Sequence, residues 1–267
     1  MRIALLGGGV IARLLLEHLQ RDEAEVVAIA GRREGLRAQA LAAEFGVPFV
    51  VGAAALIAVR PQLVVEAASH DAVREYGEAL LSNGIGMIVL SGGALVDDAL
   101  RQRLERAAAL GGQLYVPSGG IGGLDALKAA CAAGVDEVRI TIAKPPRAWK
   151  NIPFVERMGI DLDALTGPAT LFEGSAREGV PHFPANVNIA AVLALAGAGV
   201  DRTRLEVVAD PALRFNTHSI RARGPTGKIE LRFENVPSPE NPRTAMLACY
   251  SALAAVRQFG ARVRYGT

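Results

Sequence analysis

The first thirty residues constrain the fold of this chain more than any other stretch. Arg2 to Leu6 form a short apolar run, a glycine-rich turn follows, and apolar residues then recur at helical spacing. This strand, turn and helix carry the pattern Gly7-x-Gly9-x-x-Ala12, which is typical of a dinucleotide-binding site. The free N–H groups at the start of such a helix face the phosphates of the ligand. The residues expected to contact the phosphates are Gly7, Gly9, Val10 and Ile11.

The residues after the second predicted strand, Glu25 to Ala30, bear on the choice of cofactor. NAD-selective sites place an Asp or Glu at the end of this strand, where it binds the ribose 2′-OH. Here Gly31, Arg32 and Arg33 follow instead, and guanidinium groups suit a 2′-phosphate. We therefore expect Arg32 to contact the cofactor, which is NAD or NADP. The competing interpretation is that both arginines are solvated loop charges.

Strand and helix patterns alternate through the first half of the chain, which predicts a parallel sheet with right-handed crossovers. Further strands are expected at 48–51, 63–67, 87–90 and 113–116, with helices at 36–45, 53–59, 71–83 and 97–110. Ligands of such sheets lie beyond the carboxyl ends of the strands. Ala68 and Ser69 follow the fourth strand and are therefore expected at the rim of the cofactor site, as are residues 91–93.

A glycine-rich segment, 117–123, separates this half from a stretch with a different pattern. It predicts a domain junction, alone or combined with a backbone contact to a ligand. The strands expected beyond it, at 137–143, 170–175, 205–209, 217–223 and 228–235, alternate as in an antiparallel or mixed sheet. We predict an α/β protein with an N-terminal Rossmann-type parallel-sheet domain, 1–117, on which the C-terminal helix within 241–267 packs. A C-terminal α+β domain with a mixed sheet, 118–240, would hold the substrate.

Composition argues against several classes of protein. A formal charge of +2 at pH 7, with scattered basic residues, gives no footprint for nucleic acid. The uncharged run 183–200 contains a proline, two asparagines and two glycines, so it predicts a buried helix of about twelve residues. Such a helix is roughly 18 Å long, which is shorter than the hydrocarbon core of a bilayer at roughly 30 Å. We therefore expect no membrane span. Cys131 and Cys249 lack metal-ligand spacing and predict buried thiols in a reducing cytoplasm, and no metal site is expected.

The segment Asn216-Thr217-His218, at the start of a predicted strand, contains the best candidate for a catalytic residue. An imidazole titrates near neutrality, and two hydrogen-bonding neighbours could orient it. A histidine buried for structural reasons is the competing interpretation.

Two other polar groups stand in apolar or rigid surroundings. Asn186 and Asn188 open the predicted buried helix, where one could cap the helix and the other could bind a ligand. Lys144 lies directly before two prolines, in a basic loop that also holds Arg147 and Lys150.

Together these residues resemble the L-aspartate dehydrogenase family. The resemblance extends over nearly the whole chain and depends on five segments: Val64 to Ser69, Pro117 to Asp125, Lys144 to Pro146, Phe183 to Asn188, and Asn216 to His218. It implies a homodimeric, NAD(P)-dependent enzyme that deaminates L-aspartate oxidatively to iminoaspartate, which feeds NAD biosynthesis or hydrolyses to oxaloacetate and ammonia. Residues 118–240 would then also serve dimerisation.

The resemblance further implies that His218 is the active-site residue and that Gly120 and Asn188 contact the cofactor. The family has alanine where this chain has Gly120, and the smaller residue should still let the backbone approach the ligand. His218 would take the proton of the substrate ammonium, directly or through water.

A substrate with two carboxylates needs fixed cations. Lys144, Arg147, Lys150 and Arg243 are the available pool, and Lys144 is our choice, with a solvated loop lysine as the competing interpretation. Asn186 and Thr217 would supply neutral donors to the substrate. Other readings are a reductase of the dihydrodipicolinate-reductase or homoserine-dehydrogenase type, a non-catalytic NAD(P)-binding sensor, and a structural dimer with a vestigial glycine loop.

Overall fold

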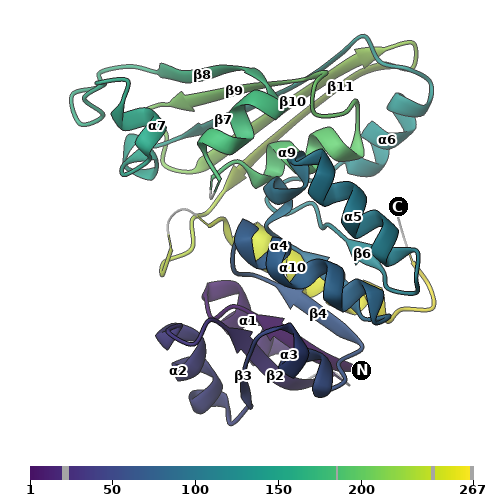
Figure 1. Ribbon diagram of the computed structural model, residues 1–267. Helices are drawn as coiled ribbons and strands as arrows, with labels where there is room; N and C mark the ends of the chain where they lie inside the picture. Colours follow the sequence, from purple (N-terminus) through teal and green to yellow (C-terminus); the bar gives the residue numbers. More distant parts are fainter. Residues whose placement is uncertain (20–23, 185, 242–243, 265–267) are drawn as a thin grey trace. The chain divides into compact units, whose positions relative to one another are not determined.

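The structure, a computed structural model, describes residues 1–19, 24–184, 186–241 and 244–264 (Figure 1). These residues form two compact units. The first contains Met1–Pro117 and Cys249–Arg264, and the second contains Ser118–Ala248. Each unit has its own sheet, and each is described by itself.

The first unit is built on a six-stranded sheet with the order β3-β2-β1-β4-β5-β6. Its strands are β1 (Arg2–Leu6), β2 (Glu25–Gly31), β3 (Phe49–Val51), β4 (Leu63–Glu66), β5 (Gly86–Val89) and β6 (Leu114–Tyr115). All neighbouring strands pair in parallel, which confirms the predicted Rossmann-type sheet. The strand order reverses between β1 and β4, the place where ligands bind in such sheets.

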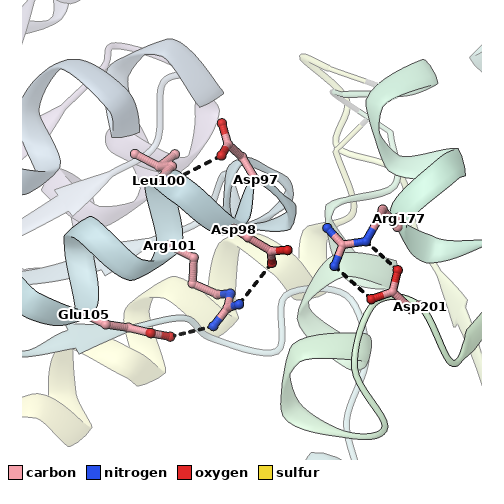
Figure 2. A network of polar contacts seen from close by, with 7 residues as sticks. All are labelled: Asp97, Asp98, Leu100, Arg101, Glu105, Arg177 and Asp201. Atoms are coloured by element: carbon pink, nitrogen blue, oxygen red, sulfur yellow. Dashed lines mark hydrogen bonds and ion pairs between the residues drawn. The ribbon is translucent and has the colours of Figure 1, made fainter.

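Helices α1 (Val10–Leu19), α2 (Leu36–Phe45), α3 (Ala53–Ala58), α4 (His70–Ser82) and α5 (Asp98–Ala108) follow the strands, with a 3₁₀ turn η1 (Gly92–Val96) before α5. Asp97 caps α5 by accepting a hydrogen bond from the backbone N–H of Leu100 at 3.1 Å. On the same helix, Arg101 pairs with Asp98 and Glu105, both at 3.0 Å, as Figure 2 shows. Capping and pairing at these spacings explain why a strongly charged sequence is helical here.

The last helix, α10 (Met246–Phe259), returns to the first unit from Cys249 onward. The Tyr250 ring meets His18 of α1 edge-on with centroids 5.7 Å apart, and the Tyr115 hydroxyl donates to Gln258 at 3.4 Å. A Cβ added to Gly86 of β5 would lie 2.3 Å from the ring of Phe259, so this glycine makes room for the helix.

The second unit is built on a five-stranded mixed sheet with the order β11-β10-β7-β9-β8. Its strands are β7 (Glu137–Lys144), β8 (Ala169–Ser175), β9 (Thr203–Ala209), β10 (Asn216–Gly224) and β11 (Gly227–Asn235). β7 and β9 are parallel and the other pairs are antiparallel, which confirms the predicted mixed sheet. Buried residues alternate with accessible ones along β7, so one face of the sheet forms a core.

Short helices accompany this sheet (Figure 1). They are α6 (Leu124–Ala132), η2 (Pro146–Trp149), α7 (Pro153–Glu156), α8 (Ala176–Gly179), η3 (Val180–His182) and α9 (Asn188–Ala196). A Cβ on Gly197, at the end of α9, would lie 2.8 Å from Leu127, which shows how tightly α6 and α9 pack. Arg177 of α8 binds Asp201 at 2.8 Å (Figure 2), an exposed pair.

Two expectations about this region are wrong. The helix predicted within 183–200 has nine residues instead of about twelve, because it begins only at Asn188, four residues after Pro184, and its C-cap is Gly197. Cys249 is buried as expected, but Cys131 of α6 is only half-buried. Among the helices in the described ranges, none has the length and apolar character to cross a bilayer.

Candidate active site

The turn after β1 contains three consecutive glycines, and a side chain added at each of them would meet different surroundings. Gly7 has φ of 112°, and a Cβ there would lie 2.7 Å from the carbonyl oxygen of Ala67. A Cβ on Gly8 would lie 2.3 Å from the Cα of Ala38 in α2, a packing role that sequence reasoning missed. The turn therefore requires Gly7, and the packing of α2 requires Gly8.

Gly9 differs from both of these glycines. Its φ is not positive, and a Cβ added to it would meet no described atom within 4 Å. Neither the backbone nor the packing of the described residues explains a glycine here. The position directly precedes α1, whose first N–H groups lack intrahelical partners. A pyrophosphate approaching this helix start would use the space that a side chain would fill, so the turn fits a dinucleotide.

The end of β4 is organised by Glu66, which is fully buried. One carboxylate oxygen accepts from the backbone N–H of Ala68 at 2.8 Å and from the Ser91 hydroxyl at 2.9 Å, and the other accepts from the Ser91 N–H at 3.0 Å. Burial raises the pKa of Glu66, although these hydrogen bonds oppose the shift. Glu66 thus joins the segments that follow β4 and β5, including the predicted rim.

Sequence reasoning did not single out Glu66, although a carboxylate ending the otherwise apolar strand Leu63–Glu66 was a usable signal. Ala68 is exposed, and the Ser69 hydroxyl caps α4 by accepting from the Ala72 N–H at 3.2 Å. Arg32 is exposed just past the end of β2, where its carbonyl accepts from Gly35 in a turn.

In the second unit, His218 is the third residue of β10 and is 1% exposed. It lies opposite Ile142 of β7 and Phe233 of β11, so its ring stands on the buried face of the sheet. Because side chains alternate along a strand, Thr217 points to the other face. Its hydroxyl donates to the carbonyl of Phe215 at 3.4 Å. Thr217 therefore does not orient the imidazole, contrary to expectation.

Asn235, the last residue of β11, orients the ring instead. Its side-chain nitrogen lies 2.9 Å from His218 Nδ1 and 2.7 Å from the carbonyl oxygen of Gly120, and the residue is 4% exposed. Sequence reasoning missed Asn235. The available signal was an amide on the face of β11 that otherwise carries apolar residues such as Leu231 and Phe233.

Lys144 ends β7 and is 2% exposed, so the interpretation as a solvated loop lysine is wrong. Its ammonium donates to the backbone carbonyl of Asn186 at 3.0 Å and lies 5.1 Å from the ring centroid of Trp149. Burial, and then the positive charge of Lys144, lower the pKa of His218 to about 3. The imidazole is therefore neutral at physiological pH.

The other proposed cations are placed differently. Arg147 is exposed, and Lys150 pairs with Asp163 at 2.6 Å. Arg243 lies outside the described residues.

Four buried polar atoms of the second unit have no hydrogen-bond partner within the described part of the chain. Thr203 Oγ1 and Ser238 Oγ are two of them, and the two that belong to the group around Lys144 are His218 Nε2 and Asn186 Oδ1. Buried polar atoms are normally paired, so these two are candidates for binding a ligand. The residue that caps α9 is Val187, so the expectation that an asparagine caps this helix is wrong. Asn188 is the first residue of α9. The described residues contain no cluster of His, Cys, Asp or Glu suited to a metal ion.

Comparison with known proteins connects both units to one family. Residues 125–259 match the family profile "Aspartate dehydrogenase, C-terminal", and residues 7–117 match "Homoserine dehydrogenase, NAD binding domain". L-aspartate dehydrogenase 2 of Bordetella pertussis is 44% identical over 267 residues, with 99% of both chains covered. The chain belongs to the L-aspartate dehydrogenase family. This confirms the resemblance found in the sequence.

Two further relatives of the family agree. L-aspartate dehydrogenase of Ruegeria pomeroyi is 42% identical over 265 residues, covering 99% of this chain and 94% of the relative. The crystal structure of aspartate dehydrogenase from Thermotoga maritima is 29% identical, covers 100% of this chain and 99% of its own, and has a TM-score of 0.76. A dihydrodipicolinate reductase from Paenisporosarcina has a TM-score of 0.54 at 17% identity, which shows a shared fold alone.

Proposed function

We propose that this protein catalyses the NAD(P)-dependent oxidative deamination of L-aspartate to iminoaspartate, which hydrolyses to oxaloacetate and ammonia. The observation that carries the proposal is the buried group formed by Lys144, His218 and Asn186 in the mixed-sheet unit. It combines a fixed positive charge, an uncharged ring nitrogen and an amide oxygen. An amino acid with carboxylate and amine groups is complementary to this set.

The cofactor is NAD or NADP, and when bound it accepts the hydride. The glycine turn before α1 supports phosphate binding, and the exposed Arg32 supports a contact with a 2′-phosphate. The residues that we propose to hold the cofactor are Gly7, Gly9, Val10, Ile11, Arg32, Ala68, Ser69, Gly120 and Asn188. For the last two, the support is the resemblance to the family.

The residues of the mixed-sheet unit are proposed to bind and orient the substrate. The Lys144 ammonium would neutralise a substrate carboxylate, and Asn186 Oδ1 would accept a hydrogen bond from the amine. His218 would contact the substrate through Nε2. That Thr217 supplies a donor to the substrate stays a prediction. Its side chain lies on the opposite face of the sheet from His218.

We further propose that the enzyme is a homodimer of the cytoplasm and that its product feeds NAD biosynthesis. The family resemblance supports this proposal, and residues 118–240 are the proposed dimerisation region. Analytical ultracentrifugation of the purified protein would measure the mass of the assembly, and a monomer at micromolar concentration would contradict the dimer.

The activity is tested by following NAD(P)H formation with L-aspartate at alkaline pH, beside a panel of other amino acids. We expect aspartate-selective turnover that falls at least about 100-fold in His218→Ala while cofactor binding persists. The matched control is His18→Ala, which removes a half-buried histidine of α1 in the other unit. Tight cofactor binding without turnover of any amino acid would instead favour the sensor, and turnover of a different substrate would favour a related reductase.

A further inference from the structure

We infer that Asn235 is a positioning residue that holds His218 in the neutral tautomer with its proton on Nε2. His218 then gives the substrate a hydrogen-bond donor and does not take the proton of its ammonium. This inference rests on the proposed function and deepens it. It replaces the role of base that the sequence predicts for His218.

The first step concerns which end of the Asn235 amide faces its partners. The carbonyl oxygen of Gly120 can only accept a hydrogen bond, and it lies 2.7 Å from the Asn235 side chain. The amide must therefore present its NH₂ group there. A reversed amide would place two acceptor oxygens against each other in a buried site.

The second step transfers this orientation to the imidazole. The same NH₂ group lies 2.9 Å from His218 Nδ1, so its second hydrogen is donated to that ring nitrogen. Nδ1 must then carry a lone pair, and the single proton of a neutral imidazole is on Nε2. The junction loop at Gly120 thus sets the tautomer of a histidine 98 residues further along the chain through one intervening amide.

The third step is that the ring stays neutral. The groups around it on the buried face of the sheet are apolar or amide residues of β10, β7 and β11: Ile142, Asn216, Ile220, Phe233 and Asn235. Among the described residues of these strands on that face, Lys144 is the charged one, and its charge opposes protonation of the ring. A doubly protonated imidazole would also direct an N–H at the Asn235 NH₂ group.

The fourth step assigns the buried atoms to a substrate. A carboxylate accepts hydrogen bonds, so it suits His218 Nε2–H and the Lys144 ammonium, whereas an amine suits the oxygen of Asn186. The amine must then lose its extra proton to solvent before the oxidation. As the hydride leaves Cα for the oxidised nicotinamide cofactor, which would thereby be reduced, the nitrogen lone pair forms the C=N bond, and the iminium product keeps both remaining N–H protons. No proton is transferred to His218.

The test begins with nitrogen NMR of the ring of His218 in the intact protein. We expect a protonated Nε2 and an unprotonated Nδ1 from pH 6 to 9. In Asn235→Asp, a carboxylate would accept from Nδ1–H, so the proton should move to Nδ1 and the ring should titrate at higher pH. Asn83→Asp is the matched control, because Asn83 ends α4 and is exposed. A protonated Nδ1 in the unaltered protein would overturn the inference.

Kinetics provide the second readout. If Nε2 serves as a donor, His218→Gln keeps an N–H donor and should remain at least about tenfold more active on L-aspartate than His218→Ala. The pH profile of kcat/KM should lack an inflection near neutrality and gain one in Asn235→Asp. Equal inactivity of the Gln and Ala variants, together with a neutral inflection in the unaltered enzyme, would establish a base instead. Because the NMR experiment needs no turnover, it decides the tautomer even if L-aspartate is not the substrate.

Discussion

Replacing Glu66 by Gln tests whether a buried carboxylate holds the rim at the ends of β4 and β5. The amide would keep one oxygen for the two donors that share Oε1, the Ala68 N–H and the Ser91 hydroxyl. Its NH₂ group would take the place of Oε2 and would face the backbone N–H of Ser91, a donor against a donor. One buried N–H thus loses its acceptor, which costs about 1–3 kcal/mol.

Thermal unfolding provides the assay. At roughly 2–4 °C per kcal/mol for a chain of this size, Tm should fall by about 2–12 °C. The Michaelis constant for the cofactor should rise as well, since Ala68 and Ser69 belong to the segment that Glu66 orders. Glu75→Gln, which changes an exposed carboxylate of α4, is the matched control and should leave both quantities unchanged.

The pH dependence of this effect has a definite sign. The folded-state pKa of Glu66 is raised above its unfolded value, so the carboxyl contributes stability at low pH that is lost as pH rises through the folded-state pKa. Gln does not titrate, so the stability difference between the two proteins should narrow as pH rises above about 4.5. A Glu66→Gln variant with unchanged Tm and cofactor affinity, or a difference that widens with pH, would refute the reasoning.

Three further predictions concern the two units. Gly9→Ala should keep the Tm within about 2 °C of the unaltered protein but weaken NAD(P)H binding at least about tenfold, measured by fluorescence titration. Gly7→Ala should instead lower the Tm, because the φ of 112° at this position disfavours a side chain. Arg32→Ala should raise KM for NADP at least about tenfold more than KM for NAD, and equal changes would remove its proposed role. Lys144→Met should raise KM for L-aspartate, because the proposed partner of a substrate carboxylate is removed. It should also raise the pKa of His218, because a repulsive positive charge is removed. An unchanged His218 titration by NMR would contradict this coupling.

The sequence predicted the first unit well because its signals are local. The turn at Gly7 requires a positive φ, Ala12 is fully buried, and the strands of the sheet are continuous apolar runs. The mixed sheet was also predicted correctly, since its strands alternate between core and surface. Helix ends were less accurate, because Ser69 and Asp97, rather than the apolar pattern, determine where α4 and α5 begin.

The residues that organise the candidate site were harder to predict. Asn235 binds the Gly120 carbonyl across 115 positions of sequence, and Glu66 binds Ser91 across 25. No periodicity within one element reports such pairs, because they form only when the strands come together. Local proximity even misled the reasoning for Thr217, which neighbours His218 in sequence but points to the opposite face of β10.

The return of α10 to the first unit has a consequence for the order in which the chain folds during synthesis. Residues 1–117 leave the ribosome first, but their partner segment, 249–264, emerges only after the whole second unit has been made. Until then, β5 lacks the ring of Phe259 beside Gly86, and α1 lacks Tyr250. The described part of the second unit is one stretch of sequence, Ser118–Ala248, so it can complete its fold while the nascent first unit still lacks its last helix.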